Sequence, residues 1–93
     1  MVEKFLLKVG PAYRMVTSKI INQMPIQEAI TLVVSCVEEQ RRQLLNDAIR
    51  GDKFYYGKKI VDSLDKSIKK FEERFPQIKD TVKELVFGRT ILN

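Results

Sequence analysis

The sequence contains no histidine and no tryptophan, and it has a single cysteine, Cys36. Without histidine the chain lacks the usual general acid–base group, any Ser–His or Cys–His nucleophile pair, and the commonest metal ligand. One cysteine excludes an intrachain disulfide and is typical of a reducing compartment. Because Cys36 lies in the most apolar stretch of the chain, we expect a buried and unreactive thiol.

Other arrangements that support catalysis or cofactor binding are also missing. The acidic pairs Glu38-Glu39 and Glu72-Glu73 are adjacent, and neighbours on a helix point about 100° apart, so neither pair converges on one metal ion or one proton. The four glycines are scattered and form no phosphate-binding loop. We therefore predict that the protein is not an enzyme and that it binds no metal ion and no cofactor.

Long apolar runs are absent as well. The densest apolar stretch, from Ala29 to Val37, is far shorter than the roughly 18–20 residues that cross a bilayer. The N-terminal residues contain Glu3 in a short apolar patch and have no small-residue cleavage site, unlike a signal peptide. With 93 residues, of which 44% are apolar and 31% charged, the composition predicts one globular domain, residues 1–93, located in the cytoplasm.

The clearest pattern that is present is an apolar stripe in the C-terminal half. Its members follow one another at steps of three and four residues, and the phase survives Pro76. This spacing is typical of a helix that packs against other helices, whereas a proline ends or bends a helix. We expect a helix from about Lys53 to Phe75, then a short helical segment over residues 77–87. The stripe consists of Val61, Leu64, Ile68, Phe71, Phe75, Ile78, Val82 and Leu85.

The N-terminal residues show a similar spacing. From Leu6 to Ile20 the apolar residues are again three and four positions apart, which indicates a helix. The dipeptide Gly10-Pro11 interrupts this segment, and a proline suits the first turn of a new helix. We therefore expect a short helix, a joint and a second helix, followed by a turn that ends at Pro25.

Residues 26–50 predict a further long helix. Two apolar stripes widen its buried face, which suggests a central position in the fold. A strand over Ile30–Val37 is the competing interpretation, because that stretch is rich in β-branched residues. Strong helix formers on both sides and the lack of a partner strand favour the helix. Gln40 and Arg41 interrupt the stripe, so we expect that turn to face solvent or a partner.

These elements predict an all-α fold. The architecture that we expect is an antiparallel helical bundle of three long helices with a short fourth helical segment after Pro76. Gly51 suits the end of the helix over residues 26–50, and Asp52 suits the N-cap of the helix that follows.

A net charge of +5 favours nucleic acid or another acidic surface as a partner. One local cluster combines cations with aromatic rings at the predicted connection between the helices over residues 26–50 and 53–75. Cations next to rings can bind a phosphate backbone while the rings stack on bases. We predict that the three lysines contact phosphates and that the two tyrosines stack. The cluster consists of Arg50, Lys53, Tyr55, Tyr56, Lys58 and Lys59.

Two functions follow from these patterns. The first is a non-enzymatic small basic accessory protein that binds nucleic acid or sits in a nucleoprotein assembly. The alternative is a helical protein–protein interaction adaptor or self-associating bundle, in which the C-terminal arm contacts a partner protein or a second copy. The same arm can instead fold back on the first segment, because Pro76 is a natural turning point. The predicted interface consists of Ile78, Val82, Leu85 and Val86.

Overall fold

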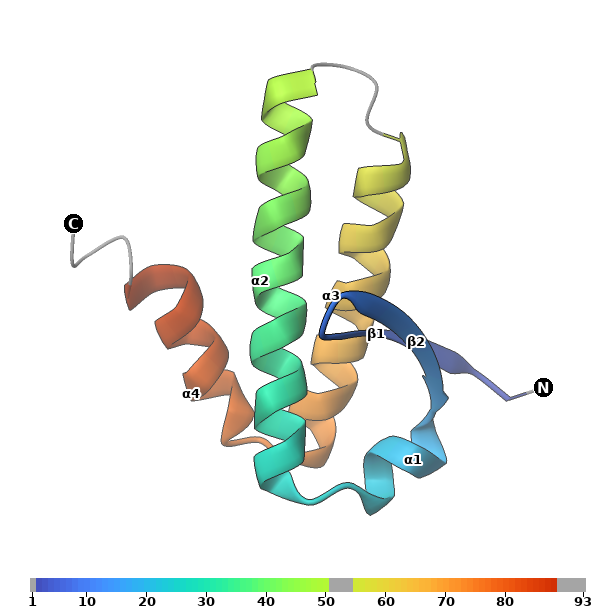
Figure 1. The fold of residues 1–93 in the computed structure, drawn as a ribbon. Coiled ribbons are helices and arrows are strands. Elements are labelled where there is room, and N and C mark those ends of the chain that lie inside the picture. The colour runs from blue at the N-terminus through green and yellow to red at the C-terminus, as the bar shows by residue number, and fades with distance from the viewer. Residues whose placement is uncertain (1, 51–54, 89–93) are drawn as a thin grey trace.

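The structure is a computed structural model that describes residues 2–50 and 55–88, and the side chains of residues 2–46 and 57–86. A β-hairpin and a short helix precede two long helices, and a short helix with a final π-helical turn follows them (Figure 1). The elements are β1 (Lys4–Val9), β2 (Ala12–Thr17), α1 (Ser18–Gln23), α2 (Ile26–Arg50), α3 (Tyr55–Arg74), α4 (Ile78–Lys83) and η1 (Glu84–Gly88).

The N-terminal residues form a hairpin instead of the two helical pieces that the sequence predicted. β1 pairs with β2 in antiparallel register, from Lys4 opposite Thr17 to Val9 opposite Ala12. The prediction of an all-α bundle with three long helices is therefore wrong. Among the described residues there are two long helices, α2 and α3, together with a two-stranded sheet.

Local chemistry explains why these residues form strands. Phe5 and Leu7 are buried on one face of β1, which is the alternation of a half-buried strand. Gly10 has a φ of +57°, and the ring of Pro11 requires a negative φ. These signs belong to a type II′ turn, which closes hairpins that have two-residue loops. The spacing that predicted a helix began at Leu6, but Leu6 is only half-buried, because the buried face of β1 is formed by its neighbours Phe5 and Leu7.

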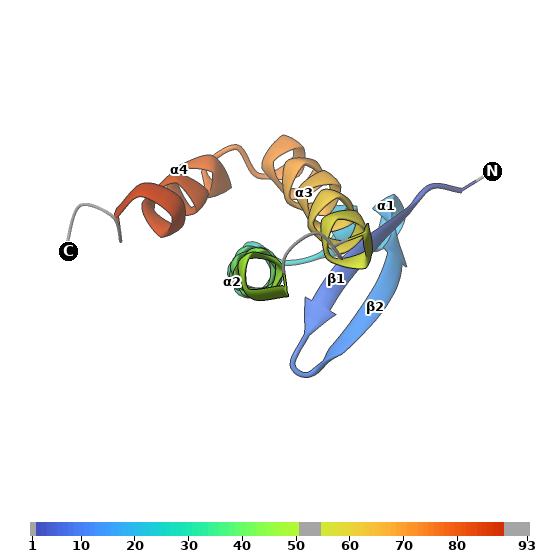
Figure 2. The ribbon, with the colours of Figure 1, turned by 90° about the horizontal axis from the view of Figure 1, so that it is seen from above.

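α2 is the central element of the fold. It lies beside α3, while the hairpin with α1 and the short helix α4 flank this pair on opposite sides (Figures 1 and 2). Ile30–Val37 lies within α2, so the predicted helix is confirmed over the competing strand. Both apolar stripes that predicted a central position contain buried residues, such as Val33 and Cys36, whereas Leu44 at the far end of the first stripe is 55% exposed.

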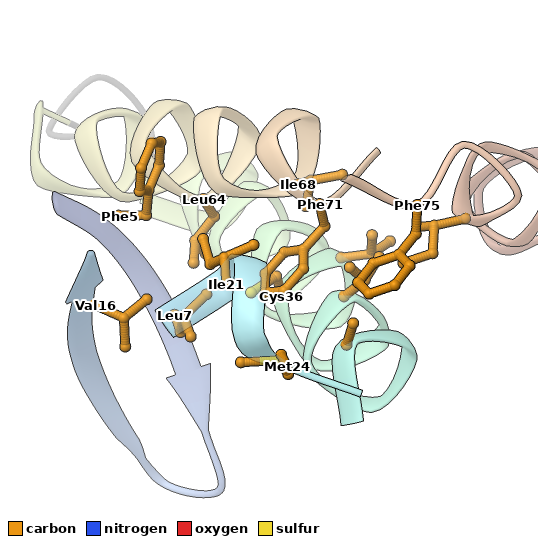
Figure 3. Close-up of a cluster of buried hydrophobic side chains, with 14 residues drawn as sticks. Phe5, Leu7, Val16, Ile21, Met24, Cys36, Leu64, Ile68, Phe71 and Phe75 are labelled. Atoms are coloured by element: carbon orange, nitrogen blue, oxygen red, sulfur yellow. The ribbon is translucent and has the colours of Figure 1, made fainter. Parts of the chain in front are cut away.

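The core lies where the hairpin, α1, α2, α3 and the start of α4 meet. Figure 3 shows side chains from β1, α1 and α3 converging on the face of α2 that carries Cys36. Cys36 is buried, as predicted, and burial raises the pKa of its thiol. The buried apolar residues are Phe5, Leu7, Val16, Ile21, Met24, Ala29, Val33, Cys36, Val37, Leu64, Ile68, Phe71, Phe75 and Ile78.

The chain turns at Pro76 without leaving the core. α3 ends at Arg74 and α4 begins at Ile78, so the break lies where the proline predicted it. The amide of Ile78 donates to the carbonyl of Phe75 at 2.9 Å, which closes a tight turn. Both of these residues are buried. The apolar stripe therefore continues from α3 into α4, and α4 packs against α2.

The turn of the hairpin gives a direct test of its backbone. We expect Gly10→Ala to destabilise the protein by about 1–2 kcal/mol, because a positive φ brings a Cβ close to the following carbonyl oxygen. No other atom lies within 4 Å of the added Cβ, so packing would not contribute. Urea unfolding measures the difference. A D-alanine at position 10, introduced by chemical synthesis, favours positive φ and should restore stability; an equal loss with both residues would contradict this explanation.

Candidate functional site

A buried carboxylate joins the tip of the hairpin to α2. Glu39 lies on α2, and only 3% of it is exposed. Lys8 on β1 and Tyr13 on β2 reach it from the hairpin, and Arg42 and Gln43 reach it from the next turn of α2. We call these five residues the Glu39 cluster. A buried charge is stable only when it is paired and hydrogen-bonded, and this cluster meets both conditions.

Glu39 accepts five hydrogen bonds. Arg42 donates two of them, from Nε to Oε1 at 2.8 Å and from Nη2 to Oε2 at 2.6 Å, which is the bidentate arrangement of a strong ion pair. Lys8 Nζ lies 3.3 Å from Oε1, and Gln43 Nε2 donates to Oε2 at 3.1 Å. The hydroxyl of Tyr13 also donates to Oε2.

These bonds keep Glu39 ionised. The hydrogen bonds from Arg42, and then those from Tyr13, Gln43 and Lys8, hold the pKa of this carboxyl well below its usual range, although burial acts in the opposite direction. Glu39 in turn raises the pKa of Arg42. Burial and then the bond to Glu39 raise the pKa of Tyr13. Because five hydrogen bonds tie this carboxylate to residues of the hairpin and of α2, the cluster acts as a structural clamp.

An open groove of about 500 Å³ lies between the hairpin tip and α2. Its two cations, Lys8 and Arg42, are both bonded to Glu39, and Glu38 adds a second negative charge. The groove therefore has no net charge and offers no strong attraction for an anion. It is lined by Lys8, Gly10, Thr31, Val34, Ser35, Glu38, Glu39 and Arg42.

The predicted nucleic-acid cluster falls at the connection between α2 and α3. Lys53 lies outside the described residues, as do the side chains of Arg50, Tyr55 and Tyr56. Lys58 and Lys59 lie in the first turns of α3, and both are exposed.

A second basic feature on α3 was missed by the sequence prediction. Lys59, Lys66, Lys70 and Arg74 are spaced by seven, four and four residues, so they lie along one side of the helix. We call these four residues the basic row. The spacing is visible in the sequence and could have revealed the row before the structure was known.

Neighbouring residues hold Lys66 and Arg74 of the basic row in place. Lys66 forms an ion pair with Glu3, and its Nζ lies 5.8 Å from the centre of the Phe5 ring. Arg74 Nε donates to the carbonyl of Asn22 at 3.3 Å, and its guanidinium lies 4.6 Å from the centre of the Phe75 ring. The row therefore runs along the seam where α3 meets the start of β1 and α1.

The neighbouring stripe on α3 has a mixed charge. Its positions are separated by steps of three and four residues, and acidic residues outnumber basic residues. An ion pair of 3.2 Å joins Lys69 to Asp65 within it. The exposed side of α3 therefore carries the basic row and this mixed stripe, together with the exposed Glu73, which pairs with Lys70. The mixed stripe consists of Lys58, Asp62, Asp65, Lys69 and Glu72.

Most of the predicted C-terminal interface packs within this chain. Ile78 is fully buried, and Val82 and Leu85 are partly buried against the core. Val86 is 43% exposed. The turn of α2 that was predicted to face solvent or a partner instead contacts this chain, since Arg41 Nη2 donates to the carbonyl of Leu85 at 2.7 Å.

Gln40, in the same turn of α2, contacts α3. Its Nε2 donates to the carbonyl of Val61 at 3.0 Å. Polar residues in the apolar stripe therefore bond to backbone carbonyls of neighbouring elements.

Comparisons with other proteins add no functional assignment. Known protein families, curated proteins and solved structures yielded no significant match to this chain. Within residues 2–50 and 55–88 no group of three or more acidic or cysteine side chains is arranged to hold a metal ion. The helices in this part of the chain are all too short or too polar to cross a membrane.

The clamp predicts a pH-dependent stability. We expect Glu39→Gln to destabilise the protein by about 1–3 kcal/mol at pH 7, because Lys8 and Arg42 lose their charged partner. The lowered pKa of Glu39 stabilises the fold above the pKa of the unfolded chain, about 4.3, and this contribution is lost as the pH falls below that value. The difference between wild type and variant should therefore shrink below about pH 4.

Urea unfolding across this pH range measures the effect. Glu38→Gln is the matched control, because Glu38 is exposed on the same helix, and we expect it to change stability by less than about 0.5 kcal/mol. A difference between wild type and Glu39→Gln that is the same at pH 3 and pH 7 would rule out the charged clamp.

Proposed function

We propose that this protein is a non-enzymatic basic accessory protein that binds nucleic acid through the basic row of α3 and the adjacent end of that helix. The observation that carries the proposal is the division of charge on α3. Four basic residues occupy the positions of the row, and Glu3 and Glu73 pair with two of them, whereas the neighbouring stripe holds more acidic than basic residues. Segregated positive charge attracts a polyanion more strongly than the same charge spread evenly.

The dimensions of the row suit a nucleic-acid backbone. From Lys59 to Arg74 the helix rises about 22 Å, at about 1.5 Å per residue. This length corresponds to roughly six phosphates of one strand, at about 3.4 Å each along a duplex. Cations one or two helical turns apart are separated by about 6 and 10.5 Å along the axis, so they can contact about every second or third phosphate.

The ion pairs already present in the row do not oppose this role. Lys66 and Glu3 are both more than half exposed, and Lys70 Nζ lies 3.9 Å from the exposed Glu73. Exposed ion pairs contribute only about 0–1 kcal/mol, so a phosphate can replace the carboxylate at little cost. The contacts of Lys66 and Arg74 with the rings of Phe5 and Phe75 involve no carboxylate.

The row begins beside the cluster that the sequence singled out. Lys59 belongs to both features, and Lys58 lies on the adjoining stripe at the same end of α3. The proposed binding surface therefore runs from the connection of α2 and α3 along the row towards Arg74. Tyrosines at the connection are the residues that we propose to stack on unpaired bases.

Paired lysine substitutions test this surface. We expect Lys66→Gln with Lys70→Gln to lower the affinity for a single-stranded or duplex oligonucleotide at least tenfold at low salt. Because each phosphate contact contributes about 0.7–0.9 to the slope of log affinity against log salt, the slope should fall by about 1.5–2. Fluorescence anisotropy across a salt series measures both quantities.

The matched control removes the same charge elsewhere. Lys69→Gln with Lys83→Gln changes two exposed lysines outside the row and should leave affinity within about twofold. A third pair, Lys58→Gln with Lys59→Gln, tests whether binding extends to the end of α3, and it should also weaken binding. No binding by the wild type at low salt, or equal losses from the row pair and the control pair, would refute the proposal.

A further inference from the structure

The two edges of the hairpin have different surroundings. β1 lies against α2 and α3, whereas β2 is the outer strand of the hairpin in the view from above (Figure 2). From Ala12 to Met15 every residue of β2 is exposed. An open strand edge presents unpaired amides and carbonyls and is a ready template for pairing with another strand.

The two-residue loop determines which backbone groups point outward. In such a hairpin the pair beside the turn, Val9 and Ala12, is hydrogen-bonded, and the following pairs alternate. The amides and carbonyls of Tyr13 and Met15 therefore point away from β1. Among the described residues, no backbone hydrogen bond outside the regular elements involves β2.

The other edge supports this alternation. The same rule directs the backbone of Leu6 and Lys8 away from β2 and towards the helices. The carbonyl of Leu6 accepts a hydrogen bond of 2.6 Å from Ser67, and the backbone amide of Lys8 bonds to Cys36. The outward groups of β1 thus find partners on α3 and α2, while the equivalent groups of β2 face solvent.

Apolar side chains gather along the same open edge. Met15 is 52% exposed and Tyr13 is 39% exposed, and both lie on one face of the strand. Ile20, in the helix that follows, is 46% exposed. An open edge flanked by exposed apolar side chains is typical of a surface that another chain covers.

We propose that β2 pairs with β2 of a second copy of this chain, so that two hairpins form one four-stranded antiparallel sheet. The two-fold axis passes through Met15, which exchanges hydrogen bonds with Met15 of the second copy. In this register Tyr13 lies opposite Thr17 of the second copy, close to the start of α1 and its exposed Ile20. A two-fold contact requires a self-complementary surface, and this register provides one.

Charge selects this register over its neighbour. With the axis at Met15, Arg14 lies opposite the apolar Val16 of the second copy. A shift of the axis to position 14 would place Arg14 opposite itself, which is destabilising. A shift to position 16 would leave only three residues of each strand paired before α1 begins at Ser18. The inference does not rest on nucleic-acid binding, because the basic row lies on α3.

The mass in solution tests whether the second copy binds. We expect sedimentation or light scattering to show a monomer–dimer equilibrium, and we expect Met15→Lys to raise the dissociation constant at least tenfold. Leu45→Lys is the matched control, because Leu45 is 62% exposed on α2, and it should leave the dissociation constant unchanged. A wild-type monomer at every concentration up to 1 mM, or a dimer that Met15→Lys does not weaken, would overturn the proposal.

Cross-linking tests the register itself. Residues in a hydrogen-bonded pair have Cα atoms about 5.5 Å apart, within the range of about 4.4–6.8 Å for a disulfide. Met15→Cys should therefore form a disulfide-linked dimer on mild oxidation. Arg14→Cys would place its thiols on a diagonal about 7–8 Å apart and should cross-link at least tenfold more slowly. The buried Cys36 of the wild type should not cross-link. Equal cross-linking at positions 14 and 15 would refute the register.

Discussion

The fold depends on the contact between Glu39 and the tip of the hairpin. A two-stranded hairpin is marginally stable on its own, and this one buries apolar side chains only near its base, at Phe5, Leu7 and Val16. Its tip is exposed, so apolar packing does not hold it. The bonds from Lys8 and Tyr13 to Glu39 attach the tip to α2 instead. One buried carboxylate thus replaces the apolar contacts that the tip lacks.

This attachment also determines which surfaces of the hairpin are exposed. With the tip fixed on α2, β1 lies against the helices, and Ser67 and Cys36 bond to its outward backbone groups. β2 is then the strand left at the rim. The same hairpin base places Glu3 and Phe5 beside Lys66, which helps to orient the basic row. The way in which the hairpin packs on α2 and α3 therefore determines both the open edge of β2 and the orientation of the basic row.

α2 contacts three neighbouring parts of the fold through three different kinds of interaction. Its apolar stripes face α3 and the core, Glu39 holds the hairpin, and Arg41 contacts the C-terminal turn. Carbonyls in the last turn of a helix lack N–H donors within that helix, and Leu85 lies in η1, the last described element of the chain. Arg41 donates to the carbonyl of Leu85 there, where a cation also interacts favourably with the helix dipole. Polar residues within an apolar stripe thus attach neighbouring elements to the central helix.

The sequence predicted the two long helices and the short helical segment after Pro76 correctly, but it predicted helices where the N-terminal strands form. α2, α3 and the break at Pro76 were correctly predicted, because periodicity over many residues outweighs local propensity. Six-residue strands supply too few positions to separate the two periods, so Leu6, Val9 and Tyr13 matched a helical spacing by coincidence. The dipeptide Gly10-Pro11 was the missed signal. A two-residue loop in which glycine takes a positive φ is typical of a hairpin and not of a joint between helices.

The clamp could not have been predicted in the same way. Glu39 looked like one of two adjacent acidic residues on a helix, although its position three residues after Cys36 places it on the apolar side of α2, unlike the exposed Glu38. Its burial depends on Lys8 and Tyr13, which reach it only after the hairpin has folded onto α2. Interactions that join residues distant in sequence leave no periodic trace. By contrast, the basic row lies within one helix, so its spacing in the sequence would have been sufficient to identify it.

The two proposed surfaces reinforce each other when both operate. Two copies joined along β2 carry two basic rows, and a nucleic acid long enough to contact both binds the second row as an intramolecular event. The apparent affinity of the dimer then rises with the length of the nucleic acid and with protein concentration. The affinity of a single row does not rise once the nucleic acid is long enough to cover that row. A short oligonucleotide that covers one row reports only the electrostatic contact. Comparing short and long nucleic acids therefore separates the contribution of the basic row from that of dimerisation through β2. If the gain in affinity with length is lost when pairing through β2 is prevented, the gain comes from the dimer and not from charge alone.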